Sequence, residues 1–328
     1  MAPSNAPEML PEQLKVDGLW WRKFAMLGSV YGPEWWKRWS PPVIAAIIFC
    51  LIGPNRRGAI ANMKRILGTR EASVATPAAL RMFVEFAHCM TETMEYFGPR
   101  PHPVRVDVPE PDLLRQTLEN GRGAVIVTGH LGNWDAAAVA LQRYGRSVTV
   151  VMAHEANAST HEYVRRMRET HDIRVVYSDE SVFSSLNLVR SLRANNIIAM
   201  QLDRGSAFGR VIAIPFFGAP AHFSEGPFHL ARVAGAPIVP CFAPRLGVRH
   251  YEIRFGSAHE MPDRSRTSGI RDIATRVVAD FEAIVRENPC QWFQFADFWA
   301  GPDAERLTRG PSQFSRESEQ PARPAARS

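Results

Sequence analysis

The sequence predicts an α/β protein in which a mixed, largely parallel central sheet of about seven strands is flanked by helices. Short apolar segments alternate with helical segments from about residue 104 onwards, and this alternation favours parallel strands that are connected by packed helices. The composition agrees with a globular domain, because 45% of the 328 residues are hydrophobic and 22% are charged. A tryptophan-rich helical segment is expected to precede this domain.

The expected strands are short runs of β-branched and other apolar residues: Ala124–Thr128, Val148–Met152, Arg174–Tyr177, Ile197–Leu202, Val211–Pro215, Ile238–Ala243 and Tyr251–Phe255. The expected helices carry apolar residues at helical spacing: Trp134–Tyr144, Ser159–Thr170, Ser184–Arg193, Gly226–Val233 and Ile270–Asn288. In open sheets of this kind, functional sites form beyond the carboxyl ends of the strands. Residues that directly follow a strand are therefore the first candidates for a site.

The N-terminal segment combines tryptophans, basic residues and a short apolar run. Five of the eight tryptophans lie before residue 40, among lysines and arginines, and the run Val43–Ile52 follows them. A run of this length is too short to cross a bilayer, which takes about 20 residues. Tryptophans and cations that flank a short apolar helix are typical of a segment lying in the membrane interface. A buried helix under an aromatic cap is the alternative.

Three parts of the chain are expected from this organisation. Residues 1–70 form the N-terminal membrane-associated helical segment, and residues 71–300 form the main domain. The main domain begins with residues 76–98, whose apolar stripe at helical spacing indicates a core helix. The tail, residues 301–328, is polar and poor in apolar residues, so we expect it to be disordered.

The formal net charge of +6 narrows the possible partners only in part. A basic surface suits an anionic membrane, an acidic carrier protein or a nucleic acid. Nucleic acid is disfavoured, because the aromatic residues do not alternate with basic residues along a groove-like stripe and no known module occurs. The four cysteines form no CxxC pair and read as reduced core residues. We expect neither a metal nor a cofactor.

The segment that follows the strand Ala124–Thr128 carries the strongest candidate site. His130 lies at the carboxyl end of that strand, Gly132 permits a tight loop and close approach of a substrate, and Asn133 can cap the next helix. Asp135 falls in the first helical turn, where it can reach back and orient the imidazole of His130 as a general base. A structural histidine that caps the helix is the alternative. The same spacing in His102 and Asp107 is discarded, since no helix holds that pair.

Later segments add candidates for substrate binding. Asp203 and Arg204 follow the strand Ile197–Leu202, although they can also be a simple turn pair. Phe216 and Phe217 suit an apolar wall for a substrate chain. Ser224 opens a helix that can bind a polar headgroup; a loop packed on the sheet is the alternative. Arg168 lies in a group of arginines, which suits phosphate but is more often a solvated face.

The order of several motifs makes the chain resemble a known family. GHLGNWD at residues 129–135 is followed by an arginine-rich helix ending in MRE, then QLDRG, PFFG, a helix ending in LARVAGAPIVP, and ENPCQWF. Over roughly residues 20–300, the chain resembles the lysophospholipid acyltransferase superfamily. Within it, the motifs are similar to the branch of late lipid A biosynthesis acyltransferases and phosphatidylinositol mannoside acyltransferases.

That resemblance implies a glycerolipid acyltransferase-like fold and an O-acyltransferase activity. The enzyme would move a fatty acyl chain from an acyl-carrier-protein or CoA thioester to a hydroxyl of a lipid A-type, glycolipid or lysolipid acceptor. It would lie at the cytoplasmic face of the bacterial inner membrane. The family's catalytic pair maps onto His130 and Asp135, its arginine onto Arg168 and its later acidic residue onto Asp203.

The expected mechanism needs no covalent acyl-enzyme. His130 removes the proton of the acceptor hydroxyl, and backbone N–H groups at Gly132–Trp134 are candidate donors to the tetrahedral oxyanion. Two other functions stay open at this point. The same pair can activate water in a thioesterase or lipid hydrolase, or the chain is a non-catalytic lipid binder at the membrane surface.

Overall fold

The computed structural model describes residues 27–98, 101–152, 168, 170–177, 182–204, 210–262 and 269–301. Most of the expected helix Ser159–Thr170 and nearly all of the tail lie outside these residues. The expected strands are largely confirmed. β2 (Ala124–Thr128) and β3 (Val148–Met152) have the predicted bounds, and β4 (Ile173–Tyr177), β5 (Ile197–Gln201) and β8 (Ile238–Phe242) begin or end within one residue of them.

In the described part of the chain, the central sheet has six strands in the order β11-β8-β2-β5-β3-β4. The strands from β8 to β4 pair in parallel, and only the edge strand β11 (Arg254–Phe255) runs antiparallel to its neighbour. Because β5 lies directly beside β2, with Thr128 opposite Gln201, the residues that follow these two strands meet at one edge of the sheet.

Two of the seven expected strands take different places. β6 (Val211–Phe216) pairs with β7 (Ala219–Ser224) in a separate two-stranded hairpin. The turn residues Phe217 and Gly218 both have positive φ, which suits a tight hairpin turn. The run Tyr251–Phe255 divides between β10 (His250–Glu252) and β11. β10 joins β9 (Arg245–Gly247) and β1 (Arg105–Asp107) in a small third sheet.

Helices cover both faces of the central sheet. α5 (Pro111–Glu119) and α6 (Trp134–Leu141) pack on one face, while α8 (Val182–Arg193), α9 (Gly226–Ala234) and α10 (Gly269–Glu287) pack on the other. Alternate residues of β2 reach the two cores: Val125 and Val127 belong to one, Ala124 and Ile126 to the other. Burial on both faces explains why these strands read as continuous apolar runs.

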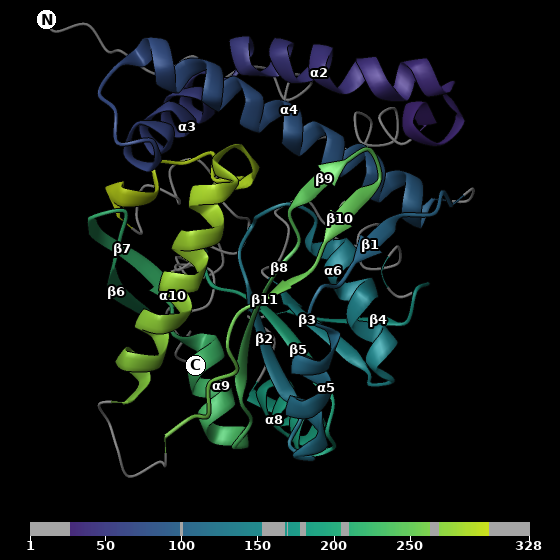
Figure 1. The fold of residues 1–328 in the computed structure, drawn as a ribbon, viewed down its shortest axis with the longest axis vertical. Coiled ribbons are helices and arrows are strands. Elements are labelled where there is room, and N and C mark those ends of the chain that lie inside the picture. Colours follow the sequence, from purple (N-terminus) through teal and green to yellow (C-terminus); the bar gives the residue numbers. More distant parts are fainter. Residues whose placement is uncertain are drawn as a thin grey trace, which may run out of the picture.

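The helices α2 (Glu34–Leu51), α3 (Gly53–Ile66) and α4 (Ala72–Phe97) follow one another in the N-terminal part of the described chain. Figure 1 shows them together at one end of the molecule, with α2 running along α4. The core helix expected at residues 76–98 is confirmed as α4, which buries Met82 and Phe83. Phe49 of α2 meets Phe83 edge to face, with ring centroids 5.2 Å apart.

The outer side of the N-terminal helices is apolar and faces away from the protein. Seven large apolar side chains are more than half exposed and follow one another at steps of four residues: Leu27, Tyr31, Trp35, Trp39, Val43, Ile47 and Leu51. We call these seven side chains the apolar edge. By length and composition, no single helix in the described part of the chain can cross a membrane; α2 and α3 pass that test only as a pair bent by 101°.

Candidate active site

The loop between β2 and α6 is built for close packing around His130. Gly132 has a φ of +61°, and a Cβ there would lie 2.0 Å from the carbonyl oxygen of Ala243, so only glycine fits. Asn133 caps α6 as expected, because its side-chain oxygen accepts hydrogen bonds from the backbone N–H groups of Asp135 and Ala136. These contacts fix the positions of His130 and of the first turn of α6.

The carboxylate that contacts the imidazole of His130 is that of Asp203. Its Oδ1 lies 2.8 Å from Nδ1 of His130, and its Oδ2 accepts the backbone N–H of His130 at 2.8 Å. Oδ2 also accepts the indole N–H of Trp292 at 2.8 Å. Asp203 is almost completely buried, whereas the His130 side chain is 15% exposed. The pair therefore has its carboxylate inside the protein and its imidazole toward the surface.

The surroundings of Asp203 keep it ionised. Burial alone would raise the pKa of this carboxyl, but the charge of His130 and the hydrogen bonds from His130 outweigh burial and lower the pKa to about 2, from 3.8. Because the pKa is depressed, the stabilisation that the carboxylate provides is complete above about pH 3.8 and is lost as the pH falls through about 2. At neutral pH, Asp203 is an acceptor, which requires the proton on Nδ1 of His130.

Asp135 has a different partner from the one that the sequence predicts. Its Oδ1 accepts Nε–H of Arg168 at 2.7 Å, and both side chains are buried. The physical reason is the rotation of about 100° between successive helical residues. The ring of Trp134 packs on the ring of His130, with centroids 5.2 Å apart. The side chain of the next residue, Asp135, therefore points in a direction about 100° away from His130 around the helix axis. In these contacts Asp203, and not Asp135, is the carboxylate that lies against the imidazole of His130.

An apolar pocket lies beside this pair, between α6 and the sheet. The pocket is shallow and partly open to solvent. Its walls come from the inner face of α6 and from β2, β3, β5 and β8: Ile126, Thr128, Trp134, Ala137, Ala138, Leu141, Val150, Met152, Ala199, Met200, Gln201 and Cys241. Asp135 and Arg168 complete the lining. The small side chains of Ala137 and Ala138 leave the space that a larger residue would fill.

The other predicted binding residues lie behind the pair or at its side. Arg204 donates to the side chain of Gln294 and to the carbonyl oxygen of Phe293. Ser224 is buried, and its hydroxyl accepts the N–H of Gly226. The hydroxyl of Ser224 therefore contacts the first residue of α9 inside the protein and does not face an open headgroup loop.

The aromatic wall expected at Phe216 and Phe217 does not line the pocket. Phe216 is buried in an aromatic cluster, where it stacks on Phe281 and Trp299 and meets Trp292 edge to face. Phe217 is half-buried against Phe216, and the guanidinium of Arg286 lies over its ring. The cluster supports Trp292 from behind and so supports Asp203 indirectly.

The backbone groups expected to stabilise an oxyanion are partly used by the fold. The N–H of Gly132 donates to the carbonyl oxygen of Gln291, and that of Asn133 donates to the carbonyl oxygen of Ala243. Of the three expected donors, only the N–H of Trp134 has no acceptor among the described residues. Of the three N–H groups, that of Trp134 is therefore the one still able to donate a hydrogen bond to an oxyanion.

Trp292 is the site residue to which the sequence reasoning assigned no role. It lies in the ENPCQWF motif, after α10, and is completely buried. The motif contacts the His130 loop throughout, since Leu131 forms a β-bridge with Trp292 and the N–H of Phe293 donates to the carbonyl oxygen of His130. A tryptophan that directly follows a glutamine in this motif was the available signal, because a buried indole N–H needs an acceptor.

Comparison with known proteins places these features in one family. A family model described as bacterial lipid A biosynthesis acyltransferase matches residues 16–300. A phosphatidylinositol mannoside acyltransferase of Mycolicibacterium smegmatis is 29% identical over 204 residues, which are 60% of this chain and 62% of that protein. A protein of the same name from Mycobacterium tuberculosis is 26% identical over 247 residues, 73% of this chain and 75% of that protein. The matches thus span between about three fifths and three quarters of the relatives.

Proposed function

Because this chain belongs to the family of bacterial lipid A biosynthesis acyltransferases, we propose that it transfers a fatty acyl chain from an acyl-carrier-protein or CoA thioester to a hydroxyl of a membrane lipid. The observation that carries the proposal is the contact of 2.8 Å between Nδ1 of His130 and Asp203. A base whose second nitrogen donates to a buried carboxylate has a fixed tautomer and a fixed orientation.

In the proposed reaction, Nε2 of His130 takes the proton of the acceptor hydroxyl as the hydroxyl oxygen attacks the thioester carbonyl carbon. Asp203 stabilises the imidazolium that forms. The C–S bond then breaks, and the imidazolium returns its proton to the leaving thiolate. The products are the acyl ester and the free thiol, and the base is regenerated. No covalent acyl-enzyme is needed.

The pocket beneath α6 supports an acyl chain as the transferred group. Its walls are almost entirely apolar, and they include Trp134, whose ring packs on His130. Apolar pockets with a few polar groups near the opening are the usual sites for such chains. The ion pair of Asp135 and Arg168 supplies those polar groups in our proposal.

The apolar edge supports a membrane position for the enzyme. Tryptophan rings at headgroup depth and exposed aliphatic side chains along one helix are typical of a segment that lies in the interface. The basic residues Arg56 and Arg57 follow at the start of α3 and suit anionic lipid. We place the protein on the cytoplasmic face of the inner membrane, because both proposed donors are cytosolic thioesters.

The acceptor is proposed from the relatives. Two proteins that resemble this chain are named phosphatidylinositol mannoside acyltransferases, so a glycolipid hydroxyl is the first acceptor to test. Lipid A-type precursors and lysolipids are the other acceptors in the test.

The test is a radiolabelled transfer assay in membranes. Acyl-carrier-protein and CoA thioesters serve as donors and the total lipid extract of the host as acceptor, and wild type is compared with His130→Ala. A labelled lipid that requires His130 is the expected result. If the label appears only as free fatty acid, the protein is a hydrolase and not a transferase. If it binds lipid but forms no product that depends on His130, it is a lipid-binding protein and not an enzyme.

A further inference from the structure

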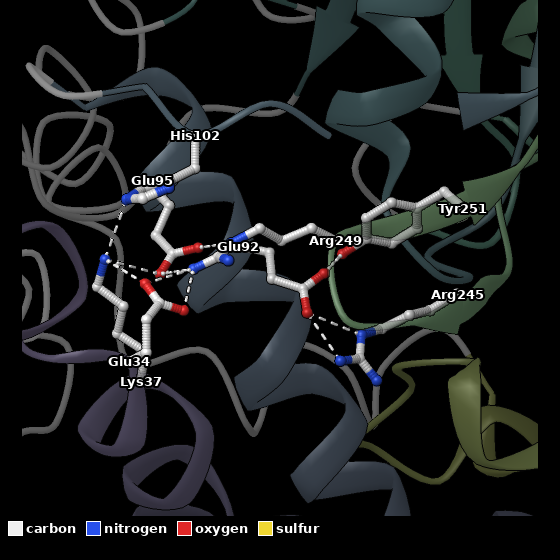
Figure 2. Close-up of polar contacts among 8 residues, drawn as sticks. All are labelled: Glu34, Lys37, Glu92, Glu95, His102, Arg245, Arg249 and Tyr251. Atoms are coloured by element: carbon white, nitrogen blue, oxygen red, sulfur yellow. Dashed lines mark hydrogen bonds and ion pairs between the residues drawn. The ribbon is translucent and has the colours of Figure 1, made fainter. Parts of the chain in front are cut away.

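Two buried glutamates of α4 each bind an arginine of the β9–β10 hairpin. Figure 2 shows both pairs side by side. Glu92 Oε1 accepts Nη2 and Nε of Arg245 at 2.7 and 3.1 Å, and Glu92 Oε2 accepts the hydroxyl of Tyr251. Glu95 accepts Nε of Arg249 at 2.7 Å. The two pairs are alike in chemistry and lie one helical turn apart.

The two pairs differ in what lies behind the arginine. The Glu95 pair leads to α2, because Glu95 also lies 3.5 Å from Nζ of Lys37, and Arg249 donates to Glu34. This branch attaches the helix of the apolar edge to the rest of the protein. Among the described residues, no hydrogen bond or ion pair joins this branch to the His130 loop.

The Glu92 pair leads instead to the catalytic loop. The backbone N–H of Arg245 donates to Oε1 of Gln291 at 2.7 Å, and Nε2 of Gln291 donates back to the carbonyl oxygen of Arg245 at 2.9 Å. The carbonyl oxygen of Gln291 in turn accepts the N–H of Gly132 at 3.0 Å. Two residues, Arg245 and Gln291, thus connect Glu92 to the loop.

The loop is held from both sides by the segments that Arg245 joins. On one side, the carbonyl oxygen of Ala243, two residues before Arg245, accepts the N–H of Asn133 at 3.0 Å. On the other side, the N–H of Phe293, two residues after Gln291, donates to the carbonyl oxygen of His130 at 2.7 Å. A displacement of Arg245 therefore reaches both ends of the loop.

Stability alone does not account for this arrangement. The side chains of Arg245 and Glu92 are 10% and 5% exposed, and a buried ion pair is often no more stabilising than well-packed apolar residues of similar size. What the ion pair adds is a fixed orientation, because a planar guanidinium that donates two hydrogen bonds to one carboxylate is held in a single orientation. Glu85 adds a third contact to Arg245, at 3.3 Å.

We propose that Arg245, held by Glu92, is a positioning residue for catalysis: it fixes the loop that carries His130 against Asp203. This inference rests on the proposed function. Its matched comparison is Glu95, which makes the same kind of pair on the same helix but, in the described part of the chain, leads to α2 and not to the loop.

The experiment compares Glu92→Gln with Glu95→Gln in detergent micelles, where docking on a bilayer does not limit the rate. A misplacement of about 1 Å can cost about 100-fold in rate, so Glu92→Gln is expected to lower kcat by about 10- to 100-fold with little change in KM. Glu95→Gln is expected to keep kcat within about twofold, although both variants lose thermal stability. Arg245→Lys keeps the positive charge but loses the planar guanidinium with its several N–H donors, so its kcat should lie between those of wild type and Glu92→Gln.

A second readout needs no turnover. The rate at which diethyl pyrocarbonate modifies His130, measured by peptide mass spectrometry, should change in Glu92→Gln and stay at the wild-type value in Glu95→Gln. Equal effects of the two variants on kcat and on the modification rate would reduce the Glu92 pair to a structural contact. An unchanged modification rate in Glu92→Gln would also overturn the proposal. If the wild-type protein transfers no acyl chain but the two variants still differ in the modification rate of His130, only the proposed function is overturned.

Discussion

Replacing Asp203 with asparagine tests which carboxylate serves the catalytic base. Oδ2 of Asp203 accepts two N–H groups, from the His130 backbone and from Trp292, and Oδ1 faces Nδ1 of His130. The asparagine oxygen is expected to keep the Oδ2 position, which sets the NH₂ group opposite Nδ1. Nδ1 must then be an acceptor, so the proton moves to Nε2, the atom that should receive the proton of the acceptor hydroxyl.

The size of the effect follows from the tautomer. The corresponding change in a serine protease lowers kcat by about 10⁴, and each tenfold in rate is about 1.4 kcal/mol, so the barrier should rise by about 5 kcal/mol. Initial rates of label transfer at saturating donor measure it. Circular dichroism and the melting temperature show whether the variant is folded.

Asp135→Asn is the matched control. Asp135 contacts Arg168, so this variant is expected to lose stability and to lose less activity than Asp203→Asn. An Asp203→Asn enzyme that keeps more than a tenth of the wild-type rate would refute the reasoning. A folded Asp135→Asn enzyme whose transfer rate falls as far as that of Asp203→Asn would also refute it. The sequence-based assignment of Asp135 as the orienting carboxylate would then be the better one.

Three further predictions concern the pocket, the apolar edge and a buried carboxyl. Ala199→Val adds two methyl groups to the pocket wall, on a strand that tolerates valine. The transfer rate with long-chain donors should therefore fall by about 10-fold or more relative to the rate with short-chain donors. An equal fall in rate for all chain lengths would exclude the pocket as the acyl site. Trp39→Glu should weaken binding to anionic vesicles by at least about tenfold, whereas Leu246→Glu, at an exposed apolar site on β9, should bind as wild type in the same sedimentation assay. Burial raises the pKa of Asp280 above 3.8 despite the opposing charge of His259, and Oδ2 of Asp280 has no hydrogen-bond partner among the described residues. A raised folded pKa makes ionisation a cost above pH 3.8, so Asp280→Asn should melt higher at pH 7, with a gain that shrinks as the pH falls toward 4.

Local patterns predicted the elements around the site well. β2 and β3 are runs of buried apolar residues, and Asn133 before an alanine-rich helix is a strong cap signal, so their bounds followed from the residues themselves. Val211–Pro215 was predicted as a strand of the main sheet for the same local reasons. Its actual partner depends on the turn at Phe217, whose positive φ is unusual for a phenylalanine.

The contacts between distant residues were beyond such patterns. Asp135 is five residues from His130, while Asp203 is 73 residues away, yet the strand order brings the distant carboxylate to the ring. Sequence spacing favoured the near residue because strand neighbours are set by tertiary packing, which no local motif encodes. Glu92 and Glu95 were missed for a related reason. They lie on a helix recognised by its apolar stripe, and their arginine partners come from a hairpin about 150 residues later.

The apolar edge also affects the chain before it meets any lipid. Its seven side chains then have only water or another protein surface to face, and contiguous exposed apolar patches on monomers are prone to association. In detergent-free buffer the purified protein should therefore elute from a sizing column as a larger species, and lipid or detergent should return it to the mass of one chain. Handling without detergent would then select self-associated material, in which the face that meets the bilayer is hidden.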